Sequence, residues 1–301
     1  VNMLVQWSNQ HYPQYLAELE EQTGIDPEWL VSGHLILQTE VDAPEVRDWL
    51  NKFPHKAQQL DQQQLHDNEP ALNESFSQAL WLPEIGQLRN PRLVQALKAM
   101  ALRKSINIHE HASVEQIGHQ QGRVTGIQTR SDSITADMVI VTAGAWSGQF
   151  RLEGIQPEVH PVKGQMIQFQ TEPGSIRRIS LYEGRYVIPR KDGKVLVGST
   201  LEHSEFNKSV DKQTRNELHE IAATIYPSLK DTPIINHWAG LRPGNERQTP
   251  FIGQHPAIRN LYFNTWHYRN GIVTGLASAR LCADLATGIT PTLPAEPYAL
   301  H

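Results

Sequence analysis

Two arginines near the C-terminal end of the chain occur in settings that suit recognition of a small carboxylate. Arg242 lies in an apolar turn bounded by glycine and proline, residues 238–243 (WAGLRP), and Arg269 lies in a glycine-containing loop, residues 267–273 (HYRNGIV). A guanidinium presents a rigid fork of N–H donors to a carboxylate, and this pairing is strongest where water is excluded. Either segment alone is more often a structural turn with a surface arginine. A site for a small carboxylate is the alternative interpretation, and both stay open at this point.

A second feature is an apolar strand that runs into small residues. Residues 138–141 (MVIV) are followed by residues 143–148 (AGAWSG). Small residues at the end of a strand let a ligand approach the backbone closely. A tight strand-to-helix turn without a ligand has the same pattern and is at least as common, so both interpretations stay open.

The composition is that of an ordinary soluble chain. Its 301 residues are enough for two domains or one large α/β unit, with 39% hydrophobic and 20% charged residues. The formal net charge of -5 argues against nucleic acid as a partner. No apolar run reaches the length of about 18 residues that a membrane-spanning helix requires.

Cysteine and histidine offer little support for a metal site. The single cysteine, Cys282, excludes an internal disulfide and a cysteine-rich metal site, and it fits a reducing cytosol, so we expect a cytoplasmic protein. The 14 histidines are scattered. Their closest pair, His109 and His111, has the spacing of a strand and no third ligand nearby, so no metal is expected.

The elements that position these residues form a mixed pattern, α/β or α+β. An opening helix carries Leu4 and Leu16 at helical spacing and ends near Gly24. A later helix has Asn90 as its N-cap and Pro91 at its first position.

Periodicity and turn residues predict the remaining elements. The expected strands cover residues 32–39, 106–110, 114–117, 123–129 and 134–142, and a hairpin joins 186–190 to 194–198 through Lys191-Asp192-Gly193. The expected helices cover residues 42–60, 93–103, 211–226 and 274–287.

Several segments, in the same order, resemble the glycine oxidase branch of the FAD-dependent D-amino-acid oxidase family. They are residues 90–94 (NPRLV), 141–148 (VTAGAWSG), 161–166 (PVKGQM), 186–190 (YVIPR) and 196–200 (LVGST), together with 238–243 and 267–273. The resemblance runs through almost the whole chain, and a set of ordered segments is far more specific than any single one.

The resemblance implies a flavoprotein with two domains. The implied Rossmann-like FAD-binding domain comprises residues 1–24, 83–157 and 238–301, and the implied antiparallel-sheet substrate domain comprises 25–82 and 158–237. Such enzymes oxidise the Cα–N bond of an amino acid to an imine and pass a hydride to FAD, which dioxygen reoxidises with release of hydrogen peroxide. A small amino acid and dioxygen are therefore the expected partners, and the oligomeric state, a homo-oligomer included, stays open.

The resemblance also assigns residues to the cofactor. Val114 matches the position whose backbone holds the adenine, while Gly144 and Trp146 lie on a loop near the cofactor. The helix that follows residues 267–273 would direct its N-terminal dipole toward the pyrimidine side of the flavin, which favours the anionic reduced flavin. The loop that wraps the isoalloxazine ring is matched by His267, Tyr268, Arg269, Asn270, Gly271, Ile272 and Val273.

Three residues are assigned to the substrate by the same resemblance. Arg242 matches the arginine that binds the carboxylate, Arg269 matches a second arginine of that site, and the hydroxyl of Tyr186 helps to hold the carboxylate. Two alternatives stay open, in which Tyr186 is an ordinary strand aromatic and Arg269 serves only the flavin. No catalytic side chain is expected, because the chemistry needs no protein nucleophile and consists mainly of positioning.

The chain departs from the family pattern at its beginning. The family opens with a strand, a G-x-G-x-x-G turn and a helix that cradle the FAD pyrophosphate, whereas no G-x-G occurs in this sequence and Val1 opens inside a helical pattern. Either the first βαβ unit is missing from the record, or another polypeptide supplies it, or the protein has lost the cofactor. We favour an incomplete, N-terminally truncated record, because the flavin-loop and substrate residues are otherwise in place.

A second departure is local. Trp266 occupies a position where relatives usually carry glycine, and residues 272–276 (IVTGL) replace a more usual Leu-Ala-Pro-type run. A tryptophan beside the flavin would narrow the site, stack near the ring or block it.

These observations predict an FAD-dependent oxidase of glycine or a similar small amine-bearing acid, such as sarcosine or D-alanine, that serves synthesis of the thiamine thiazole. One alternative is a dehydrogenase of the same superfamily that acts on a D-amino acid or on sarcosine. Another is a cofactor-less paralogue that acts as a binding subunit.

Overall fold

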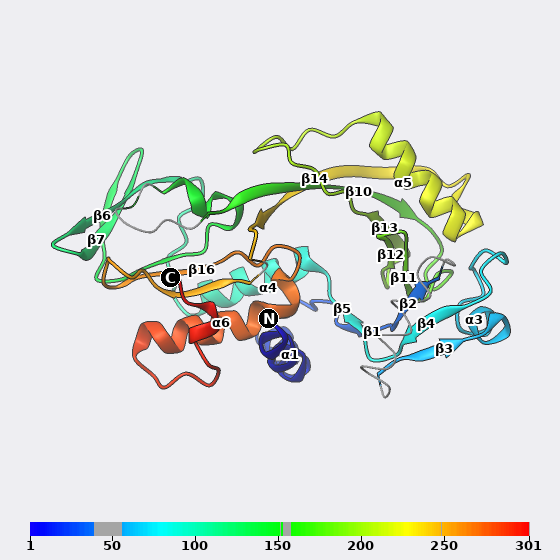
Figure 1. Cartoon of the computed structure of the whole chain (residues 1–301), viewed down its shortest axis with the longest axis horizontal. Helices are drawn as coiled ribbons and strands as arrows, with labels where there is room; N and C mark the ends of the chain where they lie inside the picture. The colour runs from blue at the N-terminus through cyan, green and yellow to red at the C-terminus, as the bar shows by residue number, and fades with distance from the viewer. Residues whose placement is uncertain (39–55, 151, 153–157, 248, 301) are drawn as a thin grey trace.

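An eight-stranded sheet occupies one half of the molecule, and two three-stranded sheets lie in the other half together with helices (Figure 1). The computed structural model describes residues 1–38, 56–150, 152, 158–247 and 249–300. The expected mixture of helices and sheets is confirmed. No helix among these residues is long and apolar enough to cross a membrane.

The large sheet has its strands in the order β14-β10-β13-β12-β11-β2-β4-β3. Their bounds are β14 (Ile234–Gly244), β10 (His160–Gln170), β13 (Lys194–Gly198), β12 (Arg185–Pro189), β11 (Ile179–Tyr182), β2 (His34–Leu37), β4 (Ala79–Leu82) and β3 (Gln58–Leu60). All neighbours are antiparallel except β11 and β2, which are parallel.

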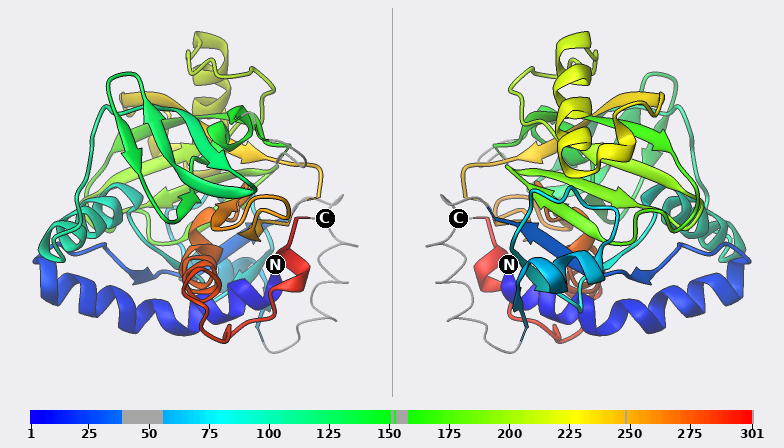
Figure 2. Two further views of the ribbon diagram at one scale, coloured as in Figure 1. Left: turned by 90° about the vertical axis from the view of Figure 1, so that its left-hand side faces the viewer. Right: turned by 90° about the vertical axis from the view of Figure 1, so that its right-hand side faces the viewer.

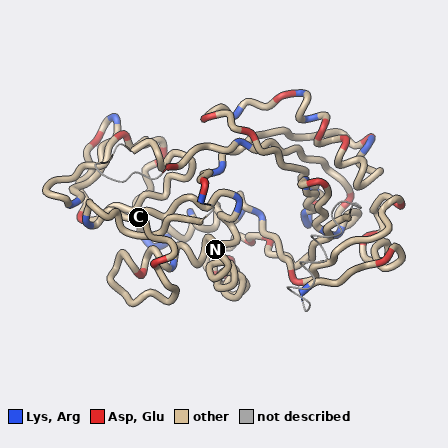
Figure 3. The backbone as a smooth tube through the Cα atoms, in the orientation of Figure 1, with Lys and Arg blue, Asp and Glu red and all other residues tan. Residues whose placement is uncertain are grey.

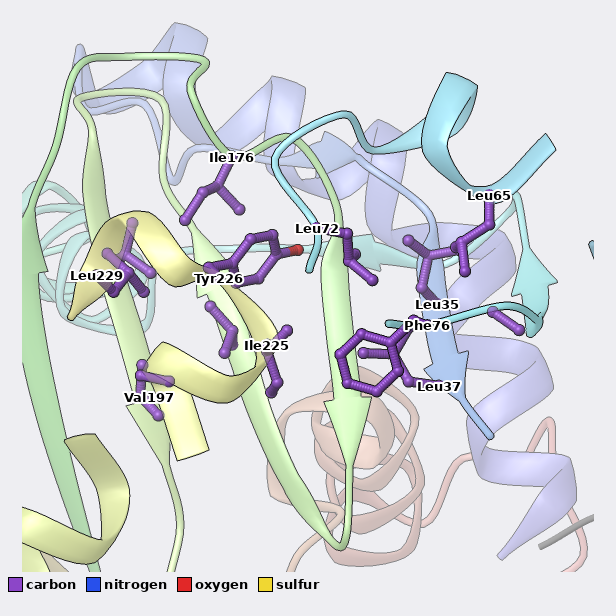
Figure 4. Close-up of a cluster of buried hydrophobic side chains, with 14 of the residues drawn as sticks. Leu35, Leu37, Leu65, Leu72, Phe76, Ile176, Val197, Ile225, Tyr226 and Leu229 are labelled. Atoms are coloured by element: carbon purple, nitrogen blue, oxygen red, sulfur yellow. The ribbon is translucent and has the colours of Figure 1, made fainter. Parts of the chain in front are cut away.

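One face of this sheet is covered by α5 (Lys212–Ile225). The helix begins after Asp211, whose side chain accepts a hydrogen bond from the backbone N–H of Thr214 at 2.8 Å, as an N-cap residue does. Figure 4 shows Ile225 of the helix and the neighbouring Tyr226 among the buried side chains of this layer, which include Val197 of the sheet. Since strand residues alternate between faces, their neighbours along each strand lie on the opposite face of the sheet.

The other half of the molecule is built around a three-stranded sheet with the order β15-β16-β9. Its strands are β15 (Phe251–Gln254), β16 (Leu261–Thr265) and β9 (Val139–Val141), with β9 parallel to β16. The helices α1 (Asn2–Thr23), α4 (Asn90–Arg103) and α6 (Gly271–Thr287) accompany it. Figure 2 shows α1 at the end of the molecule opposite to α5.

Smaller elements complete the chain. They are β1 (Leu30–Val31), paired with β5 (Gly86–Gln87); the sheet β6 (Val114–Gln120), β7 (Arg123–Thr129) and β8 (Ser133–Thr135); α3 (Gln62–Asn68); and the 3-10 turns η1 (Gly144–Gln149), η2 (Pro227–Leu229) and η3 (Glu296–Tyr298). Basic and acidic residues are interspersed along the described chain (Figure 3).

Most of the local predictions are confirmed. The first helix ends at Thr23, where Gly24 adopts a left-handed φ of 72°. The predicted hairpin is present as β12 and β13. The predicted helix 211–226 is α5, and the last helix, α6, begins at Gly271, three residues before the predicted start at 274.

Four predictions need correction. Asn90 is the first residue of α4, and Arg89, without a side-chain cap, holds the N-cap position. The predicted strand 134–142 is two strands, β8 and β9, which pair in different sheets. Residues 106–110 form no strand, because no described strand lies alongside to pair with them, and Ile106 and Ile108 are exposed. The predicted helix 42–60 lies mostly outside the described residues, and its last part is the strand β3.

The predicted domain boundary before residue 238 falls inside β14. This strand pairs with β10 from Ile234 to Gly244, so the large sheet continues past the boundary and includes Arg242. The boundary predicted after residue 82 coincides with the end of β4.

Candidate active site

Arg242 lies on the edge strand β14, in place of the predicted turn, and its side chain reaches toward the loop that follows β13. Its Nη2 donates to the hydroxyl of Ser199 at 2.6 Å, and its Nη1 donates to the carbonyl of Thr200 at 3.2 Å. The side chain is half-buried. Two of its five N–H donors are therefore used by these bonds, and the others remain for a ligand.

The guanidinium of Arg242 has room because the neighbouring strand carries a glycine. A Cβ on Gly164 would lie 2.3 Å from Nη2 and 2.4 Å from Nη1 of Arg242, well inside contact distance. Gly164 lies on β10 directly opposite Gly240 of β14. The glycine in the segment 161–166 therefore provides the surface on which the guanidinium rests.

Tyr186 is connected to Arg242 through one serine. On β12 it lies opposite Gly198 of β13, and its hydroxyl donates to the Ser199 hydroxyl at 3.0 Å. Ser199 is only 6% exposed. The structure thus brings two of the three predicted substrate residues into a single chain of hydrogen bonds.

A buried polar network holds the Ser199–Thr200 segment in place. The Thr200 hydroxyl donates to Glu202, and it accepts from the backbone N–H of Gln165 at 2.9 Å. Glu202 also forms an ion pair with Lys163 at 2.8 Å, and Lys163 is buried. The Gln165 side-chain amide donates to both Glu202 and Asp211, at 3.0 and 2.7 Å.

The network keeps its carboxylates ionised. Burial alone would raise the pKa of Glu202, but hydrogen bonds from Lys163, Thr200 and Gln165 outweigh burial and lower the pKa below its ordinary value. The hydrogen bond from Gln165 is the largest of the effects that lower the pKa of Asp211 to about 2. The backbone that presents Ser199 to Arg242 is therefore held by charged partners at neutral pH.

The predicted cofactor loops meet at the other sheet. Because β9 and β16 are parallel, their carboxyl ends lie at the same edge, where ligands bind in open α/β sheets. Gly144, with φ of 55°, opens η1 after β9, and Thr265 at the end of β16 donates to Ser147 of η1 at 2.9 Å. Trp146 is 43% exposed, and its ring lies 5.6 Å from that of Phe206.

The loop between β16 and α6 contains the predicted flavin residues. The backbone N–H of Asn270 donates to the carbonyl of His267 at 2.7 Å, and α6 then begins without a side-chain cap. Tyr12 of α1 donates to the carbonyl of Ile272 at 2.5 Å and holds the first turn of the helix. Burial lowers the pKa of His267 to about 4, and its Nε2 has no hydrogen-bond partner among the described residues.

These features fit a flavin ring. An uncapped helix start leaves N–H groups that favour carbonyl oxygens or negative charge. A buried imidazole nitrogen without a partner is a second polar group that a ligand would satisfy. Both lie in the segment that carries the predicted isoalloxazine contacts.

Trp266 packs into the core of this half of the chain. Its side chain is 6% exposed and its ring lies 6.0 Å from that of Phe251, within a cluster that includes Phe263. Its φ of 69° is left-handed, a conformation in which glycine is the usual residue. The indole is therefore buried among apolar side chains, and its position relative to the flavin stays a prediction.

Two predicted residues stand apart from this arrangement. Arg269 is exposed and forms no hydrogen bond or ion pair with another described residue. Val114 is half-buried at the start of β6, opposite Thr129, in the separate sheet β6-β7-β8. The structure does not join either residue to Arg242.

Three residues of the site were not predicted from the sequence, namely Ser199, Thr200 and Gly164. The hairpin register contained a signal for the first two, because pairing 186–190 with 194–198 across the Asp-Gly turn places Tyr186 opposite Gly198 and next to Ser199. Gly164 could be interpreted only with the pairing of β10 and β14 known.

Comparisons with known proteins agree with the arrangement described above. The family model named DAO, FAD dependent oxidoreductase, matches residues 2–285. The chain is 38% identical over 301 residues to a glycine oxidase of Pseudomonas putida, covering 99% of this chain and 82% of that protein. It is 32% identical to the bifunctional protein ThiO/ThiG of Trichormus variabilis, covering 91% of this chain and 42% of that protein. A solved glycine oxidase of Geobacillus kaustophilus superposes with a TM-score of 0.92 at 27% identity, covering 99% of this chain and 82% of that one.

Proposed function

Because this chain belongs to the DAO family of FAD-dependent oxidoreductases, we propose that it oxidises the amine of glycine or a similar small amino acid. The observation that carries the proposal is the half-buried guanidinium of Arg242, which the Gly164 surface and Ser199 hold in one position with N–H donors to spare. Such a fixed fork suits a small carboxylate.

FAD is the cofactor in this proposal, and when bound it supplies the two-electron oxidation of the substrate's Cα–N bond. The residues proposed to hold it lie at the shared edge of β9 and β16 and in β6. They are Val114, Gly144, Trp146, His267, Tyr268, Arg269, Asn270, Gly271, Ile272 and Val273. The N-terminal dipole of α6 would favour negative charge on a flavin held by these residues.

The protein's own contribution is positioning. Arg242 binds the substrate carboxylate, Tyr186 helps to hold it, and Arg269 is the proposed second arginine. Because its pKa is about 4, His267 is uncharged at neutral pH and adds no positive charge to the site. No side chain needs to act as a nucleophile, since the gain comes from fixing the substrate in a reactive orientation.

The products of the proposed reaction are an imine and, with dioxygen as electron acceptor, hydrogen peroxide. Glycine, sarcosine and D-alanine are the substrates of suitable size. We also propose a role in making the thiazole of thiamine, which the likeness to the bifunctional protein ThiO/ThiG supports. The single cysteine, buried and without a partner for a disulfide within the chain, supports a cytoplasmic location.

The test uses the protein expressed from its complete reading frame. We expect a yellow protein that releases peroxide with glycine in air. Oxidation of glycine with an artificial acceptor but little peroxide would identify a dehydrogenase. A protein that stays colourless after FAD is added would contradict the proposal and favour a cofactor-less binding subunit.

A further inference from the structure

The hydroxyl oxygen of Ser199 accepts two hydrogen bonds, whereas its own proton is donated to no described residue. It accepts from Nη2 of Arg242 at 2.6 Å and from the hydroxyl of Tyr186 at 3.0 Å. A serine hydroxyl offers two lone pairs and one O–H, so these two bonds use both lone pairs. No described residue accepts a hydrogen bond from the Ser199 O–H. A buried donor without an acceptor is costly, and a bound ligand would remove that cost.

We propose that the Ser199 hydroxyl donates to the substrate carboxylate beside Arg242, and that Tyr186 acts on the carboxylate through Ser199. This inference rests on the proposed function and adds a substrate contact to it. It also gives Tyr186 an indirect role, because its hydroxyl donates to Ser199.

The geometry supports a shared ligand for serine and arginine. Nη2 of Arg242 lies 2.6 Å from Oγ of Ser199. A carboxylate that pairs with the remaining N–H donors of Arg242 therefore comes within reach of the Ser199 O–H. Charge also favours the arrangement, because a hydrogen bond to an ionised carboxylate is about twice as strong as a neutral one.

The surroundings of Ser199 prevent it from turning away. The neighbouring residue Thr200 is fixed at two groups. Its carbonyl accepts a hydrogen bond from Arg242, and its hydroxyl donates to Glu202 and accepts from the backbone N–H of Gln165. The ion pair of Glu202 with buried Lys163 anchors this segment to β10. The hydroxyl is therefore presented by a rigid backbone, which lowers the entropic cost of binding.

The experiment measures binding of glycolate, a two-carbon carboxylate without an amine, by isothermal titration calorimetry under argon. The FAD-saturated protein is compared with Ser199→Ala, Tyr186→Phe and the double variant. We expect the Kd to rise about 10- to 100-fold for Ser199→Ala and about 2- to 10-fold for Tyr186→Phe. In the Ser199→Ala background, Tyr186→Phe should change the Kd by less than about twofold, since its path to the ligand is gone.

A matched control is a second serine–tyrosine pair, formed by Ser180 of β11 and Tyr226 at the end of α5. The Ser180 hydroxyl is 2.7 Å from that of Tyr226, on the α5 side of the sheet. Ser180→Ala should leave the Kd within about twofold of the wild type.

A second background separates a direct contact from mere support of the arginine. Arg242→Lys has no Nη2 for Ser199 to hold, yet Ser199→Ala should still raise the Kd there by at least about fivefold. No further loss in that background overturns the proposal and reduces Ser199 to a support for Arg242.

The remaining outcomes are equally decisive. An equal loss from Tyr186→Phe with and without Ser199 would show that Tyr186 binds the ligand directly, and it too overturns the proposal. A wild-type protein that binds no glycolate and oxidises no glycine contradicts the proposed function itself.

Discussion

The guanidinium of Arg242 rests against the backbone of Gly164, so close that a β-carbon at Gly164 would lie 2.3 Å from Nη2. The two residues come from adjacent antiparallel strands, with Arg242 opposite Val162 and Gly164 opposite Gly240. Because Gly164 has no side chain, the guanidinium of Arg242 can lie against the backbone of β10.

Gly164→Ala should displace the guanidinium and impair activity without unfolding the protein. A displacement on the order of 1 Å at a positioned group can lower the rate about 100-fold, so we expect kcat/KM with glycine to fall about 10- to 100-fold. The control is Gly240→Ala, because a Cβ at Gly240 meets no atom within 4 Å. It should keep kcat/KM within about threefold. Equal activities of the two variants would mean that Arg242 does not depend on this contact.

Arg242→Ala should lose a charge-assisted contact with the substrate. The expected cost is about 2–4 kcal/mol, which corresponds to a decrease of roughly 30- to 1000-fold in kcat/KM. Arg242→Lys should recover only part of this loss, because an ammonium cannot reproduce the planar fork. Flavin absorbance of the purified variants should equal that of the wild type. Near-normal turnover of glycine by Arg242→Ala would place the carboxylate site elsewhere.

The stability of the protein should fall in mild acid through His34. Burial lowers the pKa of this imidazole from 6.5 to about 4, and no residue in the described part of the chain forms a hydrogen bond with its Nε2. The folded-state pKa is below the unfolded one, so the stabilising contribution is complete above pH 6.5 and is lost as the pH falls toward 4. Between about pH 7.5 and about pH 5 the loss amounts to about 2 kcal/mol. Urea unfolding should show a pH dependence weaker by that amount in His34→Gln, and an unchanged dependence would contradict the assignment.

Trp266→Gly should destabilise the protein, even though glycine suits the backbone there. Glycine relieves a left-handed φ of 69°, a gain of about 1 kcal/mol, but it deletes a buried indole, which costs about 3–5 kcal/mol. We expect a net loss of about 2–4 kcal/mol in the free energy of unfolding measured with urea. Trp146→Ala, at an exposed position, should change that free energy by less than about 1 kcal/mol. A stability gain in Trp266→Gly would show that the ring contributes no packing.

Local patterns in the sequence were sufficient for the hairpin, for α5 and for α6, because turn residues and helical spacing act over a few residues. The strand predicted at 106–110 is wrong. Alternating apolar and polar residues form a strand only where a partner strand is present. The link between Arg242 and Ser199 was also out of reach, because it depends on the sheet order β14-β10-β13, which joins segments far apart in the chain. Likewise, nothing in the residues around Trp266 indicates whether the indole faces the flavin or the core.

The hydrogen bond from Tyr12 to Ile272 cannot form until nearly the whole chain has been translated. The two residues are 260 positions apart, and the bond between Ser8 and Ala277 spans 269 positions. At a synthesis rate of about 5–20 residues per second, α1 waits roughly 10 to 50 seconds for the helix that it supports. The large sheet, whose last strand ends at Gly244, is translated before α6, so the sheet that carries Arg242 is available for folding before α1 can pair with α6.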